Sequence, residues 1–359
     1  MKTKHYLYRS ALFCGILLLF ACSKSSDGPG KELESQYQID VYVAGYAHNG
    51  SKGVAKYWKN GTAVDLTDGS GSASASDIVV DGDDIYIAGN EYNGSRYVAK
   101  YWKNGTAVSL PGGNNFAQAN AIAVYNGDVH VAGYTTESAS SLDVATYWKN
   151  GVITKLTGGS RHAYALDVAV NAGDVYIVGY ENNSQNIHVA TYWKNGTAVS
   201  IPLTDGGKYA YAQGVTVDRG HVYIAGDERL QSIVGRGVVM YWKDEAEAVV
   251  WGDGTTIDRT TAIFVSGDDV YIGGQSNNNP LSRGVATYWK NGVAVQLSEE
   301  PSYINSIFVM DDDVYAAGYE YQGEVRIATY WKNDERVHLS DGVNDGNAAS
   351  IVVTKTLIK

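Results

Sequence analysis

The sequence contains very little cysteine, and both cysteines lie near one end. Cys14 and Cys22 fall within the first 22 of 359 residues. If the chain is cut before Cys22, no pair remains that could form a disulfide, so we expect the folded part to be stabilised by packing alone.

Proline and methionine are also scarce, at 5 and 3 residues, whereas glycine and tyrosine are frequent, at 41 and 28. This composition favours many short strands joined by tight turns and leaves no place for long helices. Acidic residues outnumber basic ones. Loss of Lys2, Lys4 and Arg9 with an export signal would take the formal net charge from -11 to -14, which argues against a nucleic-acid partner.

Sequence motifs of catalysis are missing as well. The seven histidines show no metal-ligand spacing such as His-Glu-x-x-His, and neither a Gly-x-Ser-x-Gly elbow nor a phosphate-binding glycine loop occurs. We therefore expect no catalytic residue, no metal and no cofactor.

Residues 1–21 have the pattern of an export signal. Three basic residues precede an apolar stretch of 10 residues, Ala11 to Phe20, which is too short to span a bilayer as a helix. The motif Leu19-Phe20-Ala21-Cys22 that follows resembles the processing site of bacterial lipoproteins. An ordinary secretory signal is the alternative.

The lipoprotein resemblance implies an address for the protein. It implies cleavage before Cys22 and attachment of lipid to that residue, and Ser23 implies sorting to the outer membrane. Residues 22–36 are polar and rich in serine and glycine, as expected of a flexible tether. We expect a chain held in the bacterial cell envelope by its lipid, with the membrane as a partner on the surface or periplasmic side.

One phrase, Tyr-Trp-Lys, recurs seven times at intervals of 44, 46, 45, 49, 47 and 42 residues. A period near 45 with strand-like repeats is typical of a β-propeller. We therefore predict an all-β, seven-bladed propeller spanning residues 37–359 as one domain. The copies begin at Tyr57, Tyr101, Tyr147, Tyr192, Tyr241, Tyr288 and Tyr330.

The second repeat shows the expected blade of four antiparallel strands. Ser76 to Val80, Asp84 to Gly89, Tyr97 to Lys103 and Thr106 to Leu110 are the predicted strands. Asn104-Gly105 between the last two is a strong hairpin signal, because both central residues of such a turn need positive φ.

The chain ends predict closure of the ring. The first repeat starts directly at a second strand, Asp40 to Gly45, and the chain finishes with an orphan first strand, Ser350 to Val353. We expect this last strand to complete the N-terminal blade, which leaves no open sheet edge. An open solenoid is the alternative.

The repeated tryptophan is expected to pack between blades, and Trp251, the eighth, to be a packing residue too. Each Tyr-Trp-Lys lysine lies beside a short turn, so the seven lysines should form a ring on one face. We expect solvated side chains there, with contact to anionic lipid headgroups as the alternative.

The repeat also resembles a known family. Ala145-Thr-Tyr-Trp-Lys-Asn-Gly151 after Gly133-Tyr134, followed by an apolar pair and an Asp-Gly turn in several copies, resembles the bacterial extracellular propeller repeats of the HAF type over residues 40 to 342. The resemblance implies the fold and transfers no functional residue.

Candidate binding residues lie in the long loops of the face opposite the short turns. Aromatic rings there stand beside amides and carboxylates, which is what a sugar needs: stacking for its C–H faces and partners for its hydroxyls. The candidates are Glu91, Tyr92, Tyr164, Tyr180, Glu181, Tyr209, Tyr211, Glu228, Tyr303, Tyr319 and Glu320.

Three hypotheses on function follow. The first is a membrane-anchored monomeric module that binds glycan or protein through this outward face. The second is a polysaccharide-degrading hydrolase or lyase, which requires two of the glutamates to meet across a substrate. The third is a scaffold for protein assembly in the envelope.

Overall fold

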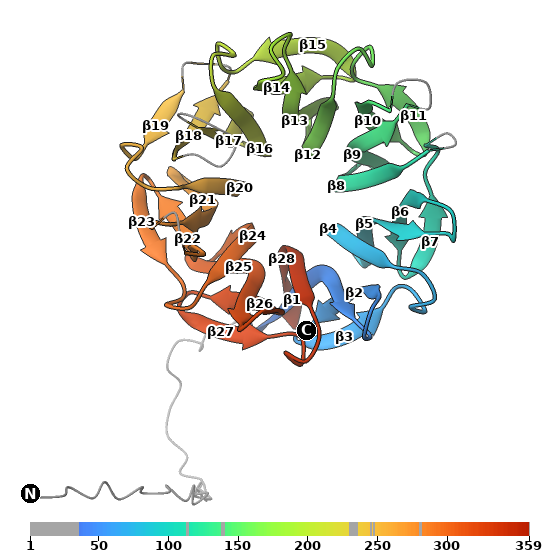
Figure 1. Cartoon of the computed structure of the whole chain (residues 1–359). Coiled ribbons are helices and arrows are strands. Elements are labelled where there is room, and N and C mark those ends of the chain that lie inside the picture. Colours follow the sequence, from blue (N-terminus) through green and yellow to red (C-terminus); the bar gives the residue numbers. More distant parts are fainter. Residues whose placement is uncertain are drawn as a thin grey trace, which may run out of the picture.

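The computed structural model describes residues 36–358 apart from 113–114, 138–140, 230–235, 245, 247 and 280–281, and describes 197–202 as backbone only. Seven antiparallel sheets of four strands each stand in a ring, with the innermost strand of each sheet toward the centre (Figure 1). We call the centre of the ring the channel. The predicted seven-bladed β-propeller is therefore confirmed. The strands of each blade follow one another from the channel to the rim, and the chain moves on to the next blade from the rim strand.

Each blade runs from its channel strand outward to its rim strand. Blade 1 is β28 (Gly346–Ile358), β1 (Gln36–His48), β2 (Gly53–Lys59) and β3 (Thr62–Asp65); blade 2 is β4 (Ala73–Asp81), β5 (Asp84–Tyr92), β6 (Tyr97–Lys103) and β7 (Thr106–Ser109); blade 3 is β8 (Ala117–Tyr125), β9 (Asp128–Thr136), β10 (Asp143–Lys149) and β11 (Val152–Lys155); blade 4 is β12 (Ala163–Asn171), β13 (Asp174–Asn182), β14 (His188–Lys194) and β15 (Thr197–Pro202); blade 5 is β16 (Tyr209–Asp218), β17 (His221–Arg229), β18 (Gly237–Lys243) and β19 (Val249–Trp251); blade 6 is β20 (Arg259–Ser266), β21 (Asp269–Ser276), β22 (Val285–Lys290) and β23 (Val293–Gln296); blade 7 is β24 (Ser302–Met310), β25 (Asp313–Gln322), β26 (Val325–Lys332) and β27 (Glu335–His338).

The ends of the chain close the ring, as predicted. β28 pairs antiparallel with β1, with Val353 opposite Val41. The pairing runs further than the sequence indicated, because Gln36 to Asp40 continue opposite Thr354 to Ile358 as a two-stranded ribbon. The pattern of single repeats did not predict this extension, because each of its two strands pairs with a segment more than 300 residues away. Tyr37 and Leu357, which are opposite each other on the ribbon, are about half exposed.

Each tryptophan of the repeat packs against the preceding blade. Trp148 of blade 3 contacts Tyr86 and Leu110 of blade 2, and its indole N–H donates to the backbone oxygen of Pro111 at 2.7 Å. The same packing of the indole recurs around the ring, and none of the seven indoles is more than 5% exposed. The hydrogen bond does not recur in every blade, because the N–H groups of Trp102, Trp193 and Trp331 are buried without a partner. Trp251 is half-buried against Tyr241, at 5.1 Å between ring centroids. The packing role predicted for the tryptophans is confirmed.

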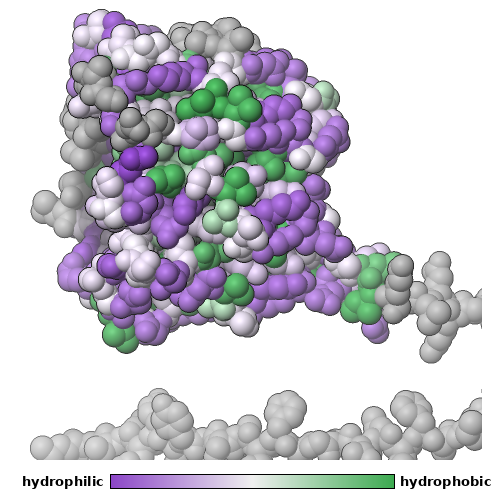
Figure 2. All heavy atoms as spheres, turned by 90° about the vertical axis from the view of Figure 1, so that its right-hand side faces the viewer, coloured by the Kyte–Doolittle hydropathy of each residue, from purple (hydrophilic) through white to green (hydrophobic). Residues whose placement is uncertain are grey.

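The rim strands expose several apolar side chains, for example Val152 at 69% and Val293 at 67%. The outer strands β3 and β11 are exposed along their whole length. On the side of the ring shown in Figure 2, hydrophobic residues are scattered among hydrophilic ones. The buried apolar residues form clusters, each made of side chains from neighbouring blades.

The bottom face carries the short turns, and in six blades the turn between the third and fourth strands is held by one repeated set of contacts. In blade 2 the backbone has φ of 50° at Asn104 and 79° at Gly105. The Asn104 side chain accepts from the Ile85 N–H at 2.8 Å and donates to Asp84 at 2.7 Å, while Lys103 pairs with Asp84 at 2.8 Å.

Six blades repeat this lysine–aspartate pair, at 2.7 to 3.2 Å. The expected lysine ring is therefore ion-paired within its own blades. In blade 5, His221 takes the place of the aspartate, and Lys243 lies over the ring of Tyr223 at 5.1 Å.

Two buried carboxylates lie at a β-bulge that recurs in the channel strand of each blade. Asp77 accepts from Ile122 N of blade 3 and from the Ser350 hydroxyl of blade 1, so it links three blades. Asp167 accepts from Val215 N of blade 5 at 2.8 Å. Burial raises the pKa of Asp167 to about 7, and the nearby charge of Asp77 adds to the shift.

We expect Trp148→Ala to destabilise the ring by about 3–5 kcal/mol, because a fully buried indole is replaced by a cavity between two blades. Denaturant unfolding followed by circular dichroism measures the loss. Val152→Ala is the control, since Val152 is 69% exposed and its truncation should change stability by less than about 0.5 kcal/mol. Equal effects of the two changes would contradict the packing role.

Asp167→Asn should flatten the pH dependence of unfolding. Because the folded pKa of about 7 lies above the ordinary value of 3.8, the folded state binds more protons than the unfolded state between these limits. The free energy of unfolding therefore falls as pH rises through this window, and the asparagine removes that contribution.

Denaturation midpoints measured every half unit from about pH 4.5 to 7.5 test this difference in slope. Asp84→Asn is the control, because its ion pair with Lys103 holds the Asp84 pKa below the ordinary value. The contribution of the Asp84 carboxylate to the free energy of unfolding is lost only as pH falls below that window. An unchanged slope in Asp167→Asn would contradict the assignment.

Candidate functional site

Seven cross-strand pairs, one from each blade, surround the channel where it opens on the top face. In each pair one residue lies on the channel strand and the other directly follows a glycine of the second strand. We call these fourteen residues the mouth ring. The pairs are Tyr46 with Asn347, Asn90 with Ser74, Tyr134 with Gln118, Tyr180 with Tyr164, Asp227 with Tyr211, Gln275 with Arg259, and Tyr319 with Tyr303.

The glycine before each pair has a steric reason. At Gly179 an added Cβ would lie 1.9 Å from the backbone oxygen of Tyr164, so no other residue fits without moving the strand. The close approach occurs beside the β-bulge, which turns the top of the channel strand relative to its lower part. The Gly-x step of the sequence therefore marks the position from which a side chain enters the mouth ring.

Aromatic side chains form a continuous row over blades 2 to 5, which we call the aromatic arc. Neighbouring ring centroids along it are 4.8 to 5.6 Å apart, within the range of favourable aromatic contacts. The last four arc members also belong to the mouth ring, on the second or channel strands of blades 3 to 5. The arc runs in the order Tyr92, Tyr97, Phe116, Tyr134, Tyr164, Tyr180 and Tyr211.

A second aromatic group lies on blade 7. Tyr303 stacks on Tyr319 at 5.8 Å, and Tyr321 meets Tyr319 edge-on at 5.4 Å. Arginines cover its outer part: the Arg283 guanidinium lies 3.8 Å from the Tyr321 ring centroid, and Arg326 pairs with Asp345 at 2.7 Å.

Between the two aromatic groups the mouth ring becomes charged. Arg229 donates to Asp227 at 3.0 Å and to the Tyr211 hydroxyl at 3.2 Å, and its guanidinium lies over the Tyr211 ring. Asp227 is fully buried and also accepts from Thr260 at 3.3 Å. Arg259 lies beside them and donates to the Asp258 backbone oxygen at 2.8 Å.

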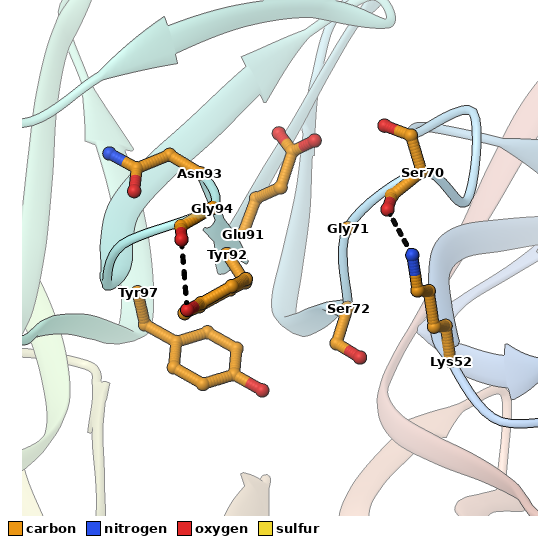
Figure 3. Close-up of a pocket in the computed structure, with 9 residues that line it drawn as sticks. All are labelled: Lys52, Ser70, Gly71, Ser72, Glu91, Tyr92, Asn93, Gly94 and Tyr97. Carbon is orange, nitrogen blue, oxygen red and sulfur yellow. Dashed lines mark hydrogen bonds between the residues drawn. The ribbon is translucent and has the colours of Figure 1, made fainter.

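Hollows on the top face lie over blades 1 to 3, at the other end of the arc. One, of about 720 Å³, is shown in Figure 3 between the loop of Ser70 to Ser72 and the turn of Glu91 to Gly94. A second, of about 420 Å³, shares Ser72 and Tyr97 with the first and reaches the mouth ring at Asn90. Together they lead from the blade loops to the channel.

The glutamates of the predicted site do not converge. Glu91 pairs with Lys100 at 2.5 Å, and Glu228 with Lys208 at 2.6 Å. Glu320 is only 4% exposed and is held by Ser298, Arg336 and His338. These acids stand on blades 2, 5 and 7, and each is neutralised by a nearby cation.

The fourth glutamate, Glu181 of blade 4, is half-buried. Burial raises its pKa, and Arg161 partly offsets that shift. Glu181 pairs with Ala163 one register step outward from the mouth ring, so its side chain leaves the opposite face of the sheet from Tyr180.

The predicted tyrosines are brought together in two groups. On blades 4 and 5, Tyr180, Tyr209 and Tyr211 surround His188, and Tyr164 contacts Tyr180. Tyr303 and Tyr319 form the blade 7 group, and Tyr92 lies apart from both groups at the start of the arc. Cys22, the predicted lipid site, lies outside the described residues. Sequence reasoning missed other members, although the Gly-x step marks five of them: Tyr46, Asn90, Tyr134, Asp227 and Gln275. It gives no signal for others, such as His188, Arg229 and Arg259.

Within the described ranges no group of three or more histidine, cysteine, aspartate or glutamate side chains is placed to hold a metal ion. No helix of that part of the chain is long and apolar enough to cross a membrane.

Comparison with known proteins supports the fold and goes no further. No protein-family model matches the chain, and no curated protein matches it significantly. Among solved structures it is similar to a puromycin-hydrolysing peptidase of Mycobacterium tuberculosis, with a TM-score of 0.51 and 10% identity. The match covers 76% of this chain and 46% of the peptidase chain. At this identity the likeness shows a shared propeller architecture alone.

His188 should stay neutral in mildly acidic solution. Burial against Tyr180 and Tyr211, together with the charge of Arg229, lowers its pKa from 6.5 to about 4. An NMR titration of the imidazole protons measures this value. We expect Arg229→Gln to raise it, and Arg219→Gln, on the bottom face, to leave it unchanged. A His188 pKa near 6.5 in the unmodified protein would contradict the packing described.

Proposed function

We propose that this chain is a glycan-binding propeller, held at the bacterial envelope by lipid on Cys22, that binds its ligand on the top face. The observation that carries the proposal is the aromatic arc, which begins beside open hollows and runs to the mouth of the channel. Sugar rings bind proteins by stacking their C–H faces on aromatic rings while amides and hydroxyls bind their hydroxyl groups. The arc supplies the rings, and Asn90, Asn93 and Gln118 line the same hollows.

The geometry of the chain also supports this orientation. Gln36, where the described chain begins, lies on the ribbon that extends beyond the bottom turns. A tether from Cys22 to Gln36 would hold the bottom face toward the membrane and leave the top face directed outward. The neutralised glutamates favour a binding module over a hydrolase, because a glycosidase needs two carboxylates free to act on one substrate.

A glycan-array screen of the purified chain, with the same samples assayed for released sugar, tests the proposal. Retention without release supports a recognition module. Release of sugar that is lost on Glu181→Gln would replace the proposal with an enzyme. If the chain neither binds a glycan nor releases sugar, and a protein partner co-purifies in equal amounts, the result would favour an assembly scaffold.

For a glycan that the array retains, Tyr92→Ala should weaken binding roughly two- to tenfold, the equivalent of about 0.5–1.5 kcal/mol for one aromatic stacking contact. Tyr92 is 38% exposed in the hollow, so its loss should leave the fold intact. Tyr37→Ala is the matched control, a 50% exposed tyrosine on the bottom ribbon. Isothermal titration calorimetry measures both, and equal affinities would remove the arc from the site.

A further inference from the structure

We infer that the two-stranded ribbon below the bottom face inserts its apolar side chains into the surface of a lipid bilayer, which gives the ring a second membrane contact beside its lipid. The ribbon, which we call the bottom ribbon, consists of residues 36–40 of β1 and 354–358 of β28. The inference rests on the lipid anchor of the proposed function and is independent of what the top face binds. The partner is the bilayer at the depth where headgroups meet acyl chains.

Exposed apolar side chains are concentrated on the bottom ribbon. Twelve large apolar residues are exposed in the described part of the chain, and six of them are spread over the rim strands of four blades. Four others fall within the ten residues of the ribbon and are 38 to 50% exposed: Tyr37, Ile39, Leu357 and Ile358. In Figure 2 the ribbon projects at the lower right and carries hydrophobic residues.

One face of the ribbon continues the core of the ring. Val41 and Val353 are opposite each other and belong to a cluster shared with blade 7. Side chains on one face of a strand recur every second residue, so Ile39, Tyr37 and Leu357 follow these valines on the same face. The valines are buried or half-buried, whereas the three residues beyond them are exposed. Within the described chain, this apolar face therefore extends past the blade that covers its upper part.

The polar groups of the ribbon suit a membrane surface. The Lys355 ammonium lies 4.6 Å from the centroid of the Tyr37 ring and pairs with Asp311 at 2.6 Å. Tyrosine and lysine are typical of the headgroup level, because their apolar parts enter the bilayer while their polar ends stay in water.

This contact does not depend on the charge of the lipid. Six of the seven lysines of the bottom turns are ion-paired with aspartates of their own blades. The bottom face therefore offers no ring of unpaired positive charge to anionic headgroups, and the apolar ribbon is the part that a neutral bilayer can bind.

The tether brings the ribbon to the membrane. Gln36 follows Cys22 by 14 residues. A flexible tether of this length would have a root-mean-square span of about 20 Å. A ribbon held so close to a bilayer meets lipid at an effective concentration in the millimolar range. A few apolar side chains, which would bind a free protein to lipid only weakly, are then enough to hold the ribbon in the interface.

A bilayer fits the ribbon better than a second copy of the chain does. Two copies joined through their ribbons would bring two bottom faces together, with acidic turns such as Asp81 to Asp84 and Asp311 to Asp313 on both. Each copy has a formal net charge of -11. Repulsion between like charges opposes that contact, whereas a neutral lipid surface does not.

Quenching of tryptophan by brominated lipid tests the inference. The lipidated chain is placed in phosphatidylcholine vesicles with and without bromine on the acyl chains, and Tyr37→Trp adds the reporter. The seven tryptophans of the repeat are at most 5% exposed, so the unmodified protein supplies the background. The emission added by Tyr37→Trp should be mostly lost in brominated vesicles. Added salt should not restore it, because an apolar contact is not screened.

Matched reporters locate the contact. Val152→Trp lies on the rim beside a bottom turn, and Val343→Trp lies in a top-face loop; the two valines are 69% and 73% exposed. Both reporters should keep their emission. In the Tyr37→Trp background, Leu357→Ser should reduce the quenching, whereas Thr356→Ser, on the opposite face of the ribbon, should leave it unchanged.

The outcomes separate this inference from the proposed function. An unquenched Tyr37→Trp would overturn the inference, and so would equal quenching of Tyr37→Trp and Val152→Trp, which would place the whole bottom face on the bilayer. Mass spectrometry of the peptide that contains Cys22 tests the anchor separately. If Cys22 carries no lipid, the anchor of the proposed function is wrong, and the same quenching is measured on chain coupled through the Cys22 thiol to a maleimide lipid.

Discussion

The ring depends on one repeated contact, a tryptophan of each blade buried against the blade before it. The seven sheets are separate from one another, so the blades are held together by apolar packing between their faces, with inter-blade hydrogen bonds such as those to Asp77 and Asp167 in addition. Trp148 shows the contact in full, with Tyr86 and Leu110 around its ring and its N–H satisfied by Pro111. Because every blade packs its tryptophan against the preceding blade in the same way, the angle between neighbouring blades repeats, and seven blades close the ring.

The two faces of the ring use their polar groups in different ways. On the bottom, Asn104, Asp84 and Lys103 satisfy one another within a single blade, so each turn is an independent unit. On the top, Tyr134 contacts Tyr164 and Tyr180 contacts Tyr211 across blade boundaries. A substitution in a bottom turn therefore affects a single blade, whereas a substitution in the aromatic arc also affects the packing of the neighbouring blade.

The fold could be predicted from the repeat. Tyr-Trp-Lys recurs at the end of a strand and Asn-Gly directly after it, and a hairpin within a blade accounts for both motifs. The repeat also indicated the tyrosines of the top face, because residues that follow a strand must lie at its end. The repeat did not indicate which side chains surround these residues. Glu320 was a binding candidate by position, yet Arg336 and His338 from a strand farther along the chain enclose it. Arg229 and Arg259 meet only because blades 5 and 6 adjoin, which no local pattern records.

Closure by the two ends of the chain also sets the order in which the molecule is completed. Blade 1 takes three strands from the beginning of the domain and its channel strand, β28, from the end. Until the last residues have been synthesised, β1 has one unpaired edge facing the centre of the ring, and Trp58 lacks the side chains of β28 in its cluster. Contacts of such long sequence separation form slowly and leave strand edges exposed to other chains in the meantime. A chain that stops short of Gly346 would keep that open edge permanently, so assembly of this ring is a test that the whole domain has been made.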